Sequence, residues 1–323
     1  MKHIMEEAVA KFLDPTIPKW GPHEEETGRP VRLAEGDPTG EGLGRHDMLY
    51  IGEGDNTMYL IVGGKTVWTY STGKGWEYDD IWMLTNGNIL FSRMYWAAEI
   101  TPHKEQVWRY DAPEGTEIHT LQPLGLDKLA MVINEQKGPR LLIINKKTGE
   151  TEVDKEIPYG SPNGTHGQNR RFRVTADGTY LMPYLSYGDV VEYDTEFNEI
   201  RRFKAKKPWA AIRLKNGNTL ISDESDESVL EYDLEGNLVW HFSVSELPED
   251  IRIAGTQSCV RLENGNTILC ARGEGGKTPQ LVEITPDKRV VWVLKDWEHL
   301  GPGTAIQVLY DGGIPENPGE CQR

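Results

Sequence analysis

The 323-residue sequence has few cysteines, a minority of basic residues and no long apolar segment. Its three cysteines are too few for the disulfide framework of a small secreted domain. Lys and Arg total 35 against 51 Asp and Glu, and the formal net charge of −16 disfavours a nucleic acid or an anionic membrane surface as a partner. No apolar stretch approaches the length that crosses a bilayer, so we expect no membrane span.

The N-terminus also lacks the apolar core of a signal peptide, because MKHIMEEAVAKFLD is acidic where that core would lie. We therefore expect a soluble protein, cytoplasmic in this form, and periplasmic or secreted if a signal peptide has been removed. Residues 4–13 predict one short helix. The rest of residues 1–45 is rich in Pro, Gly and charge and predicts either an extended arm, with Trp20 and Trp76 as candidate anchors, or a solvated leader.

What the sequence does contain is a repeated pattern of short strands. Three stretches are nearly identical: LTNGNILFS (84–92), LKNGNTLIS (214–222) and LENGNTILC (262–270). Repeats at intervals of about 40 to 50 residues are typical of four-stranded propeller blades, and Asn-Gly is typical of a tight hairpin turn. A Trp recurs in a later strand of each unit, as in GNLVWHF (236–242), and we interpret it as a packing anchor.

The repeat count predicts an all-β protein, a six-bladed β-propeller of four-stranded antiparallel blades over residues 46–313. Five blades are whole: 78–110, 118–158, 166–205, 208–242 and 254–294. The sixth combines one strand from 304–313 with three from 48–70, so that the N- and C-terminal strands close the ring and leave no free sheet edge. Residues 314–323 form a C-terminal tail, and a helical turn is expected at 243–250.

Aligned blades predict two kinds of residue pair. Cys259 and Cys270 fall opposite each other across a two-residue hairpin, in a hydrogen-bonded position whose side chains lie apart, which favours free thiols. Arginines at equivalent positions occur in blades that also carry a third-strand glutamate, and this predicts Arg–carboxylate pairs within each blade rather than an anion-binding ring. These residues are Arg173, Arg213 and Arg261 with Glu192, Glu231 and Glu283.

Propeller geometry puts the Asn-Gly turns on one face and the more variable loops on the other, where sites are usually built. Aligning the blades on the residue before each Asn-Gly turn places six residues at the starts of the inner strands, around the channel mouth: Asp79, His119, Asn169, Trp209, Gln257 and Thr304. His166, Arg170 and Arg171 lie on the same side. Adjacent loops carry four aromatic residues: Tyr95, Trp96, Tyr184 and Tyr187.

These residue types suit a small anionic or sugar-like ligand. We predict His166, His119 and Tyr184 as catalytic, because histidine transfers protons near neutral pH. The predicted substrate-binding residues include an arginine clamp for an anion and aromatic rings for a sugar face: Arg170, Arg171, Asn169, Trp209, Gln257, Asp79, Tyr95, Trp96 and Tyr187. No cofactor is predicted, and a divalent cation on His119, His166 and Gln257 stays open, although no recognised metal-ligand spacing is present.

The blade pattern L-x-N-G-N-x-L followed by x-V-V-W resembles that of the bacterial arylsulfotransferase-like and PQQ-like repeat propellers, over residues 46–313. The resemblance implies a six-bladed ring whose channel holds histidines and an arginine, one histidine being transiently sulfated in the arylsulfotransferases. His119, His166 and Arg170 or Arg171 are at compatible positions.

Three functional hypotheses result. The first is an enzyme acting on a small anionic substrate, uronate- or sulfate-bearing, glycan-derived or aryl, as a lyase or hydrolase or, less favoured, as an arylsulfotransferase-like transferase. The second is a non-catalytic propeller that binds a carbohydrate or another small ligand, and the third is a protein-interaction platform. Clustered His and Arg residues at one mouth favour the first hypothesis over the third but do not separate it from the second.

Overall fold

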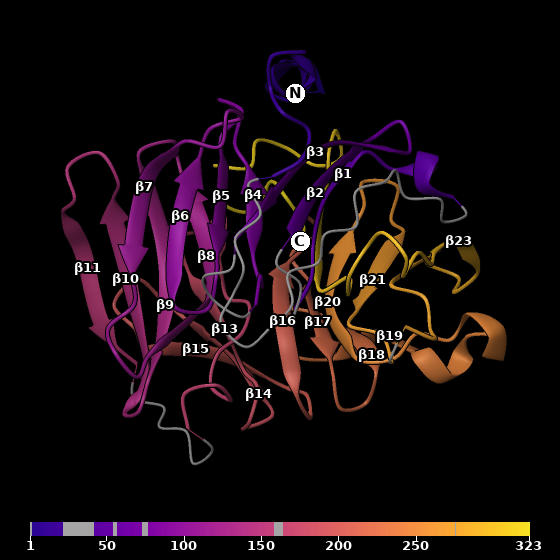
Figure 1. Ribbon diagram of the computed structural model, residues 1–323. Helices are drawn as coiled ribbons and strands as arrows, with labels where there is room; N and C mark the ends of the chain where they lie inside the picture. Colours follow the sequence, from indigo (N-terminus) through magenta and orange to yellow (C-terminus); the bar gives the residue numbers. More distant parts are fainter. Residues whose placement is uncertain (1, 22–41, 54–56, 73–76, 158–163, 275) are drawn as a thin grey trace.

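The computed structural model describes residues 2–21, 42–53, 57–72, 77–157, 164–274 and 276–323. These residues form six four-stranded antiparallel sheets arranged in a ring (Figure 1), which confirms the six-bladed β-propeller that the repeats predict. The helical elements described are one α-helix and four short 3-10 helices: α1 (Lys2–Ala10), η1 (Lys11–Leu13), η2 (Leu43–Arg45), η3 (Val244–Glu246) and η4 (Glu249–Ile251). The last two confirm the helical turn expected at 243–250.

Five blades follow the chain in order, each running from the channel outwards. Their strands are β4 (Ile81–Met83), β5 (Ile89–Ser92), β6 (Trp96–Ile100) and β7 (Gln106–Asp111); β8 (Glu117–Leu124), β9 (Lys128–Glu135), β10 (Gly138–Asn145) and β11 (Thr151–Glu156); β12 (Arg173–Val174), β13 (Tyr180–Tyr184), β14 (Asp189–Tyr193) and β15 (Glu199–Lys204); β16 (Pro208–Arg213), β17 (Thr219–Asp223), β18 (Ser228–Tyr232) and β19 (Leu238–Ser243); β20 (Thr256–Arg261), β21 (Thr267–Ala271), β22 (Leu281–Ile284) and β23 (Val290–Leu294).

The sixth blade is built from both ends of the chain. Its strands are β24 (Ala305–Val308), β1 (Met48–Ile51), β2 (Thr57–Val62) and β3 (Lys65–Ser71). β24 pairs antiparallel with β1, with Gln307 opposite Leu49. The predicted closure of the ring by N- and C-terminal strands is therefore confirmed.

The Asn-Gly turns are three-residue loops, one residue longer than the two-residue hairpins expected from the sequence. Around residues 263–265, Leu262 N donates to Asn266 O at 2.8 Å, and Gly265 N donates back to Leu262 O at 2.9 Å. Gly265 alone in this loop has a positive φ, of 88°. A type I turn followed by a left-handed glycine has this form, and Gly adopts that conformation without the steric cost of a Cβ.

The longer turn changes the expected position of two cysteines. Adding one residue to the loop shifts the strand register, so Cys259 lies opposite Leu269 and not opposite Cys270. The expected cross-strand pairing is wrong for this reason. The expectation of free thiols is confirmed, because Cys259 and Cys270 are both free and buried.

Tryptophans join neighbouring blades, as the sequence predicts. The indole Nε1 of Trp68 on β3 donates to Pro102 O in the next blade at 2.9 Å, and that of Trp240 on β19 donates to Pro286 O in the next blade, also at 2.9 Å. A buried indole N–H requires such an acceptor. The recurrent Trp is therefore a packing anchor between blades.

The repeated arginines and glutamates also pair between blades and not within them. Arg261 on β20 donates to Glu231 on β18 of the preceding blade at 2.8 Å. Arg213 on β16 likewise donates to Glu192 on β14 at 2.5 Å. The within-blade pairing expected from the sequence is wrong, because side chains on one face of a sheet point to the neighbouring sheet.

Glu283 and Arg173, at the two ends of this series of blades, have other partners than the Arg–Glu pairs between them. Glu283, in the last whole blade, is paired by Arg45 and His46, which precede β1 of the closing blade, at 2.7 and 2.8 Å. Arg173 has no glutamate available in the preceding blade, where Ile143 stands at the equivalent position. It pairs instead with Asp80 inside the channel, at 2.7 Å.

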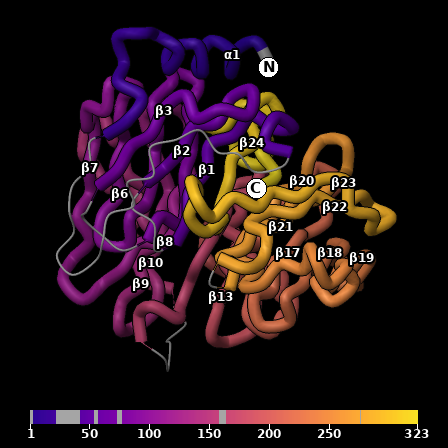
Figure 2. Tube along the Cα trace, turned by 45° about the vertical axis from the view of Figure 1, so that its right-hand side comes forward, coloured from indigo at the N-terminus to yellow at the C-terminus, as the bar shows by residue number. Residues whose placement is uncertain are grey.

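The N-terminal helix packs on the ring. α1 lies beside the sixth blade (Figure 2), and Met5, Val9 and Phe12 are buried in one apolar cluster with Trp68. The rings of Phe12 and Trp68 meet edge to face, with their centroids 5.2 Å apart. Residues 2–13 therefore contain the helix that the sequence predicts, held by its apolar side.

Of the two anchors expected for the arm, Trp20 is half-buried, and its carbonyl accepts a hydrogen bond from Lys104 Nζ at 3.1 Å. Trp76 and residues 22–41 lie outside the described residues. Of the two, Trp20 alone can be placed, and the apolar contacts of this region come mainly from Phe12 and its neighbours.

The C-terminal segment crosses the Asn-Gly face and covers the channel there. Thr85 N donates to Glu316 Oε1 at 2.7 Å, Arg261 N donates to Gln322 O at 2.9 Å, and Arg323 Nε donates to Ile306 O at 3.0 Å. The three partners belong to three different blades. The tail of residues 314–323 thus ties the blades together at the face opposite the variable loops.

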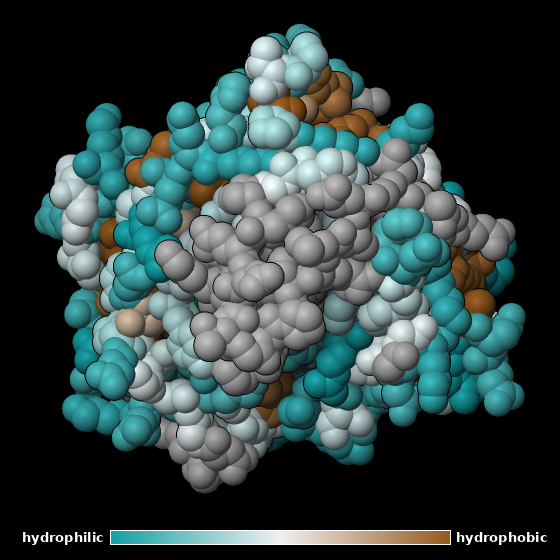
Figure 3. All heavy atoms as spheres, in the orientation of Figure 1, coloured by the Kyte–Doolittle hydropathy of each residue, from teal (hydrophilic) through white to brown (hydrophobic). Residues whose placement is uncertain are grey.

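The described surface is strongly polar. Figure 3, in the orientation of Figure 1, shows mostly hydrophilic residues among the described atoms on that face, as expected for a chain with 27% charged residues. Among the described residues, no helix has the length and apolar character needed to pass through a bilayer.

Candidate functional site

The candidate site lies where the inner strands begin, on the face opposite the Asn-Gly turns. Its centre is His119, a fully buried side chain that contacts two carboxylates: Nδ1 is 2.7 Å from Asp79 Oδ2, and Nε2 is 2.7 Å from Glu117 Oε2. Burial and Arg170 lower its pKa, but the two carboxylates outweigh them and raise the pKa of His119 above its ordinary value. An imidazolium donating to both carboxylates accounts for this geometry.

His166 is the exposed partner of this network. Its side chain is 48% exposed, its Nδ1 lies 2.9 Å from Glu117 Oε2, and its Nε2 lies 3.9 Å from Glu77 Oε1. The His119 and His166 rings are 5.2 Å apart, edge to face. Glu117 therefore orients one ring nitrogen of His166 and leaves the other facing Glu77.

The pKa values of two glutamates at the mouth are shifted in opposite directions. Glu77 is mostly buried and lies beside Asp79, and these two causes raise its pKa to about 8. Burial also opposes ionisation of Glu117, but hydrogen bonds from His119 and His166 hold the pKa of Glu117 well below its usual range. A protonated carboxyl group thus lies near an ionised one. Such a difference in pKa between two neighbouring carboxyl groups is typical of acid–base sites.

The two adjacent arginines separate, because consecutive residues of extended backbone point in opposite directions. Arg170 stays at the mouth, where Nη1 lies 2.9 Å from His119 Nε2 and 3.7 Å from Glu77 Oε2. Arg171 points into the channel and pairs with Asp80 at 3.1 Å. Both side chains are buried. These contacts place Arg170 in the histidine network at the mouth, whereas Arg171 does not reach the mouth.

The other predicted ring residues follow the wall of the channel. Gln257 Nε2 donates to Glu53 Oε2, and Glu53 N donates to Thr304 Oγ1 at 2.6 Å. Asn169 and Trp209 are also buried there. The amide of Asn169 donates to Pro183 O at 2.9 Å.

The predicted aromatic residues divide into two groups. Tyr95 and Tyr187 are partly exposed. Tyr184 is buried, and its hydroxyl lies 3.2 Å from that of Tyr193, while Trp96 is buried against Phe91, with ring centroids 5.3 Å apart. The structure therefore does not bring Tyr184 or Trp96 to the mouth.

Sequence reasoning missed Glu77 and Glu117, although a signal was present. Both stand seven residues before the alignment point of their blades, two residues before Asp79 and His119. The equivalent motifs E-Y-D and E-I-H in adjacent blades place two pairs of polar residues at one mouth. Glu53 was missed because it follows β1, in the blade shared by the termini.

Glu77, His119 and His166 also form a group that could hold a metal ion. Each offers one ligand atom, and these atoms lie within 4.8 Å of one another. Oε2 of Glu77 has no hydrogen-bond partner among the described residues, although it is buried. Glu77 takes the place of Gln257 in the set expected from the sequence, because Gln257 is directed to Glu53.

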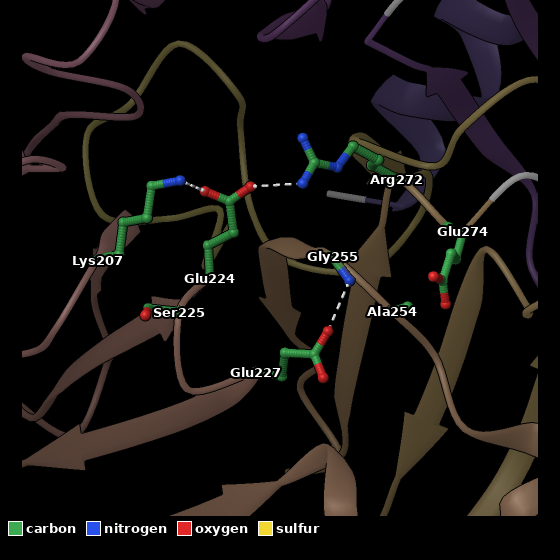
Figure 4. Close-up of a pocket in the computed structure, with 9 residues that line it drawn as sticks. Lys207, Glu224, Ser225, Glu227, Ala254, Gly255, Arg272 and Glu274 are labelled. Carbon is green, nitrogen blue, oxygen red and sulfur yellow. Dashed lines mark hydrogen bonds and ion pairs between the residues drawn. The ribbon is translucent and has the colours of Figure 1, made fainter.

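A second hollow, of about 410 Å³, lies on the same face between two other blades (Figure 4). Lys207 and Arg272 approach Glu224 from opposite sides, at 2.6 and 3.3 Å, and Glu227 accepts a hydrogen bond from Gly255 N at 3.0 Å. Gly255 lies two residues before Gln257. This hollow therefore adjoins the wall of the mouth, but its two basic groups already pair with Glu224.

No protein-family model and no curated protein matches the chain. A crystal structure of a protein of unknown function from Bacteroides caccae has a TM-score of 0.71 and 26% identity, covering 80% of this chain and 97% of that chain. This likeness supports the fold and carries no activity with it.

Two further neighbours are more distant. A catalytically inactive virginiamycin B lyase from Staphylococcus aureus, with quinupristin, has a TM-score of 0.55 and 12% identity, covering 84% of this chain and 96% of that chain. BBS1N in complex with ARL6DN has a TM-score of 0.53 and 12% identity, covering 89% of each chain. None of these three neighbours is named as an arylsulfotransferase. The chain is similar to β-propellers, some of which act on ligands or bind proteins.

Proposed function

We propose that this protein is a lyase that acts on a small anionic, uronate-bearing substrate at the channel mouth. One observation carries the proposal: His166 is half-exposed, is oriented by Glu117 at 2.9 Å and faces Glu77, a carboxyl whose pKa is raised to about 8. An oriented base beside a protonated acid is the minimum that an elimination requires.

His166 is the proposed base. Glu117 accepts a hydrogen bond from its Nδ1, so the neutral ring carries its lone pair on Nε2, the nitrogen that faces Glu77. Nε2 takes the proton from the carbon next to the substrate's carboxylate. The electrons of that C–H bond form the new C=C bond as the adjacent C–O bond breaks.

Glu77 is the proposed acid. It is protonated at neutral pH, and it gives its proton to the oxygen that leaves, so the leaving group departs as an alcohol. Its placement near His166 Nε2, at 3.9 Å, puts both proton transfers at one point of the mouth. His119 holds Glu117 and Asp79 in place and is a positioning residue, because both of its nitrogens are already bonded.

The anionic substrate needs a positive charge that the mouth supplies only in part. Four carboxyl groups gather there, Glu53, Glu77, Asp79 and Glu117, and Arg170 already contacts His119 and Glu77. A divalent cation held by Glu77, His119 and His166 would occupy the proposed acid and base, because metal ligands are deprotonated, so it belongs to an alternative arrangement and not to this mechanism. In the lyase arrangement the positive charge at the mouth comes from Arg170.

Sulfuryl transfer is the less favoured reaction. It requires a histidine nitrogen that is free to attack sulfur, and His119 offers none, since both of its ring nitrogens contact carboxylates. His166 would have to serve alone.

The test is turnover of uronate-containing oligosaccharides, followed by the absorbance of the unsaturated product, with aryl sulfates assayed in parallel. We expect product from a uronate substrate and a loss of about a hundredfold or more in His166→Ala. His299→Ala is the matched control, because His299 is also paired with a carboxylate, Asp296 at 3.1 Å, outside this network. Tight uronate binding without product would replace the lyase with a binding module.

A further inference from the structure

A cluster of arginines lies inside the channel, away from the mouth. It consists of Arg171, Arg173 and Arg323, called here the channel arginine cluster. All three guanidinium groups converge on one oxygen of Asp80: Oδ1 lies 3.1 Å from Arg171 Nη2, 3.1 Å from Arg173 Nη2 and 3.6 Å from Arg323 Nη2. Each of the four side chains is at most 5% exposed.

The charges of this cluster do not balance. Asp80 is the one carboxylate that forms ion pairs with the three arginines among the described residues. Three guanidinium charges therefore face one side-chain carboxylate and the main-chain oxygen of Arg323, which accepts a hydrogen bond from Arg173 Nε at 2.7 Å. A charge that is buried without a partner is far more costly than a charge at the surface.

Several nitrogen atoms of the cluster also lack hydrogen-bond acceptors. Nη1 of Arg171 and both Nη1 and Nη2 of Arg323 are buried and have no hydrogen-bond partner within the described part of the chain. Buried N–H donors nearly always have an acceptor. The unpaired donors occur in the same place as the unpaired charge.

The neighbouring groups do not supply the missing negative charge. Cys321 lies near Arg173 and Arg323, but burial raises the pKa of its thiol to about 11, so the thiol is neutral at physiological pH. The guanidinium of Arg323 rests on the ring of Trp82, 4.2 Å from its centroid, and a ring face provides only weak attraction for a cation.

We propose that the channel arginine cluster binds a small inorganic anion, of the size of chloride, between Arg171 and Arg323. The anion accepts hydrogen bonds from the donors that are unpaired and offsets the positive charge that Asp80 leaves. A compact anion is required because the cluster is enclosed by the inner strands and by the C-terminal segment. This site is separate from the carboxylate-rich mouth and does not depend on the proposed lyase activity.

The anion would fasten the C-terminal segment into the channel. Arg323 belongs to that segment, whereas Arg171 and Asp80 belong to two inner-strand regions of the ring. An anion shared by Arg171 and Arg323 therefore links the tail to the blades, alongside the hydrogen bond from Arg173 Nε to Arg323 O at 2.7 Å. Loss of the anion should loosen the tail before the ring unfolds.

Two measurements on the full chain test the site. Thermal unfolding is followed after dialysis into sodium gluconate and into sodium chloride of equal ionic strength, since gluconate is too large to enter. We expect a higher Tm in chloride, rising with the logarithm of its concentration, as for any ligand that binds only the folded state. Crystals grown or soaked in sodium bromide should show an anomalous peak in contact with Arg171 and Arg323.

Two variants separate the site from general salt effects. Arg323→Gln removes one cluster charge and should at least halve the dependence of Tm on chloride. Arg213→Gln removes an arginine that has its own carboxylate, Glu192, and should keep the full dependence even if it lowers stability. Equal Tm values of the wild type in the two salts, or the absence of bromide density at the cluster, would overturn the proposal.

Discussion

Arg261 donates a hydrogen bond to Glu231 of the preceding blade across 2.8 Å, and both side chains are largely buried. The same relationship joins Arg213 to Glu192 one blade earlier. Each pair connects an inner strand to the third strand of its neighbour. The arginines that recur in the sequence are therefore ties between neighbouring sheets.

Breaking one tie should destabilise the ring without affecting the mouth. Arg261→Met leaves Glu231 with Asn218 as its remaining side-chain donor, and we expect the free energy of unfolding to fall by up to about 3 kcal/mol. Urea denaturation measures this change. The double variant Arg261→Met/Glu231→Leu is the control: it should recover much of the loss, because the stranded carboxylate is gone. Equal instability of the single and double variants would contradict this account.

The N-terminal helix should depend on one aromatic contact. Phe12 is buried and meets Trp68 edge to face at 5.2 Å. Phe12→Ala should lower stability by about 3 kcal/mol and should increase amide hydrogen exchange in residues 2–13 more than in the blades. Leu13→Ala, at a neighbouring but exposed position, should change neither quantity appreciably. Undiminished protection of the helix in Phe12→Ala would show that other contacts hold it.

Glu283 should make stability depend on acid pH. Burial opposes its ionisation, but His46, Arg45 and Asn266 donate to it and lower its pKa from 4.5 to about 2. Because the folded-state pKa is below the unfolded one, the ionised group stabilises the fold above about pH 4.5, and this contribution disappears as the pH falls through about 2. Urea denaturation should show Glu283→Gln less stable than wild type at pH 7, with the difference shrinking at low pH.

The control for Glu283 is an exposed ion pair. Glu263 contacts Lys215 at 3.0 Å with both side chains about half exposed, and such pairs contribute at most about 1 kcal/mol. Glu263→Gln should therefore leave the pH dependence unchanged. A pH-independent loss in Glu283→Gln would show that packing, and not ionisation, makes Glu283 important.

The two histidines of the mouth should respond differently to replacement. Both are predicted at the mouth, but His119 is buried between Asp79 and Glu117. His119→Ala leaves Asp79 without this donor and Glu117 with His166 alone, so we expect a loss of about 1 to 3 kcal/mol in urea denaturation. His166→Ala should retain wild-type stability, because its ring is half-exposed. Equal stability of both variants would show that the network carries no folding energy.

The proposed acid predicts an upper pH limit for activity. Glu77 donates its proton only while protonated, and its pKa is about 8, so kcat should fall as the pH rises through about 8. Glu77→Gln cannot donate a proton and should lose activity at every pH, by about a hundredfold or more. A pH–rate profile of the wild-type protein measures this fall of kcat at high pH. Unchanged turnover at high pH would assign the acid to another group.

The sequence by itself determined the number of blades, their strand order and the closure of the ring. The repeated Asn-Gly stretches mark the first turn of three blades, and TAIQVL (304–309) lacks partners of its own, so pairing it with Met48–Ile51 completes a blade for both. It also placed Asp79, His119 and His166 at one mouth, because residues that begin inner strands must meet around the channel. These are consequences of local pattern and of ring geometry.

The tertiary structure decided what each side chain touches. Consecutive residues point to opposite sides of a strand, so Arg170 joined the mouth while Arg171 entered the channel, a choice the sequence left open. One extra residue in a turn moved Cys259 from Cys270 to Leu269. The partner of Arg261 proved to be in the preceding blade, because neighbouring sheets face each other across the blade boundary. Such contacts depend on packing between segments distant in sequence, which no local pattern encodes.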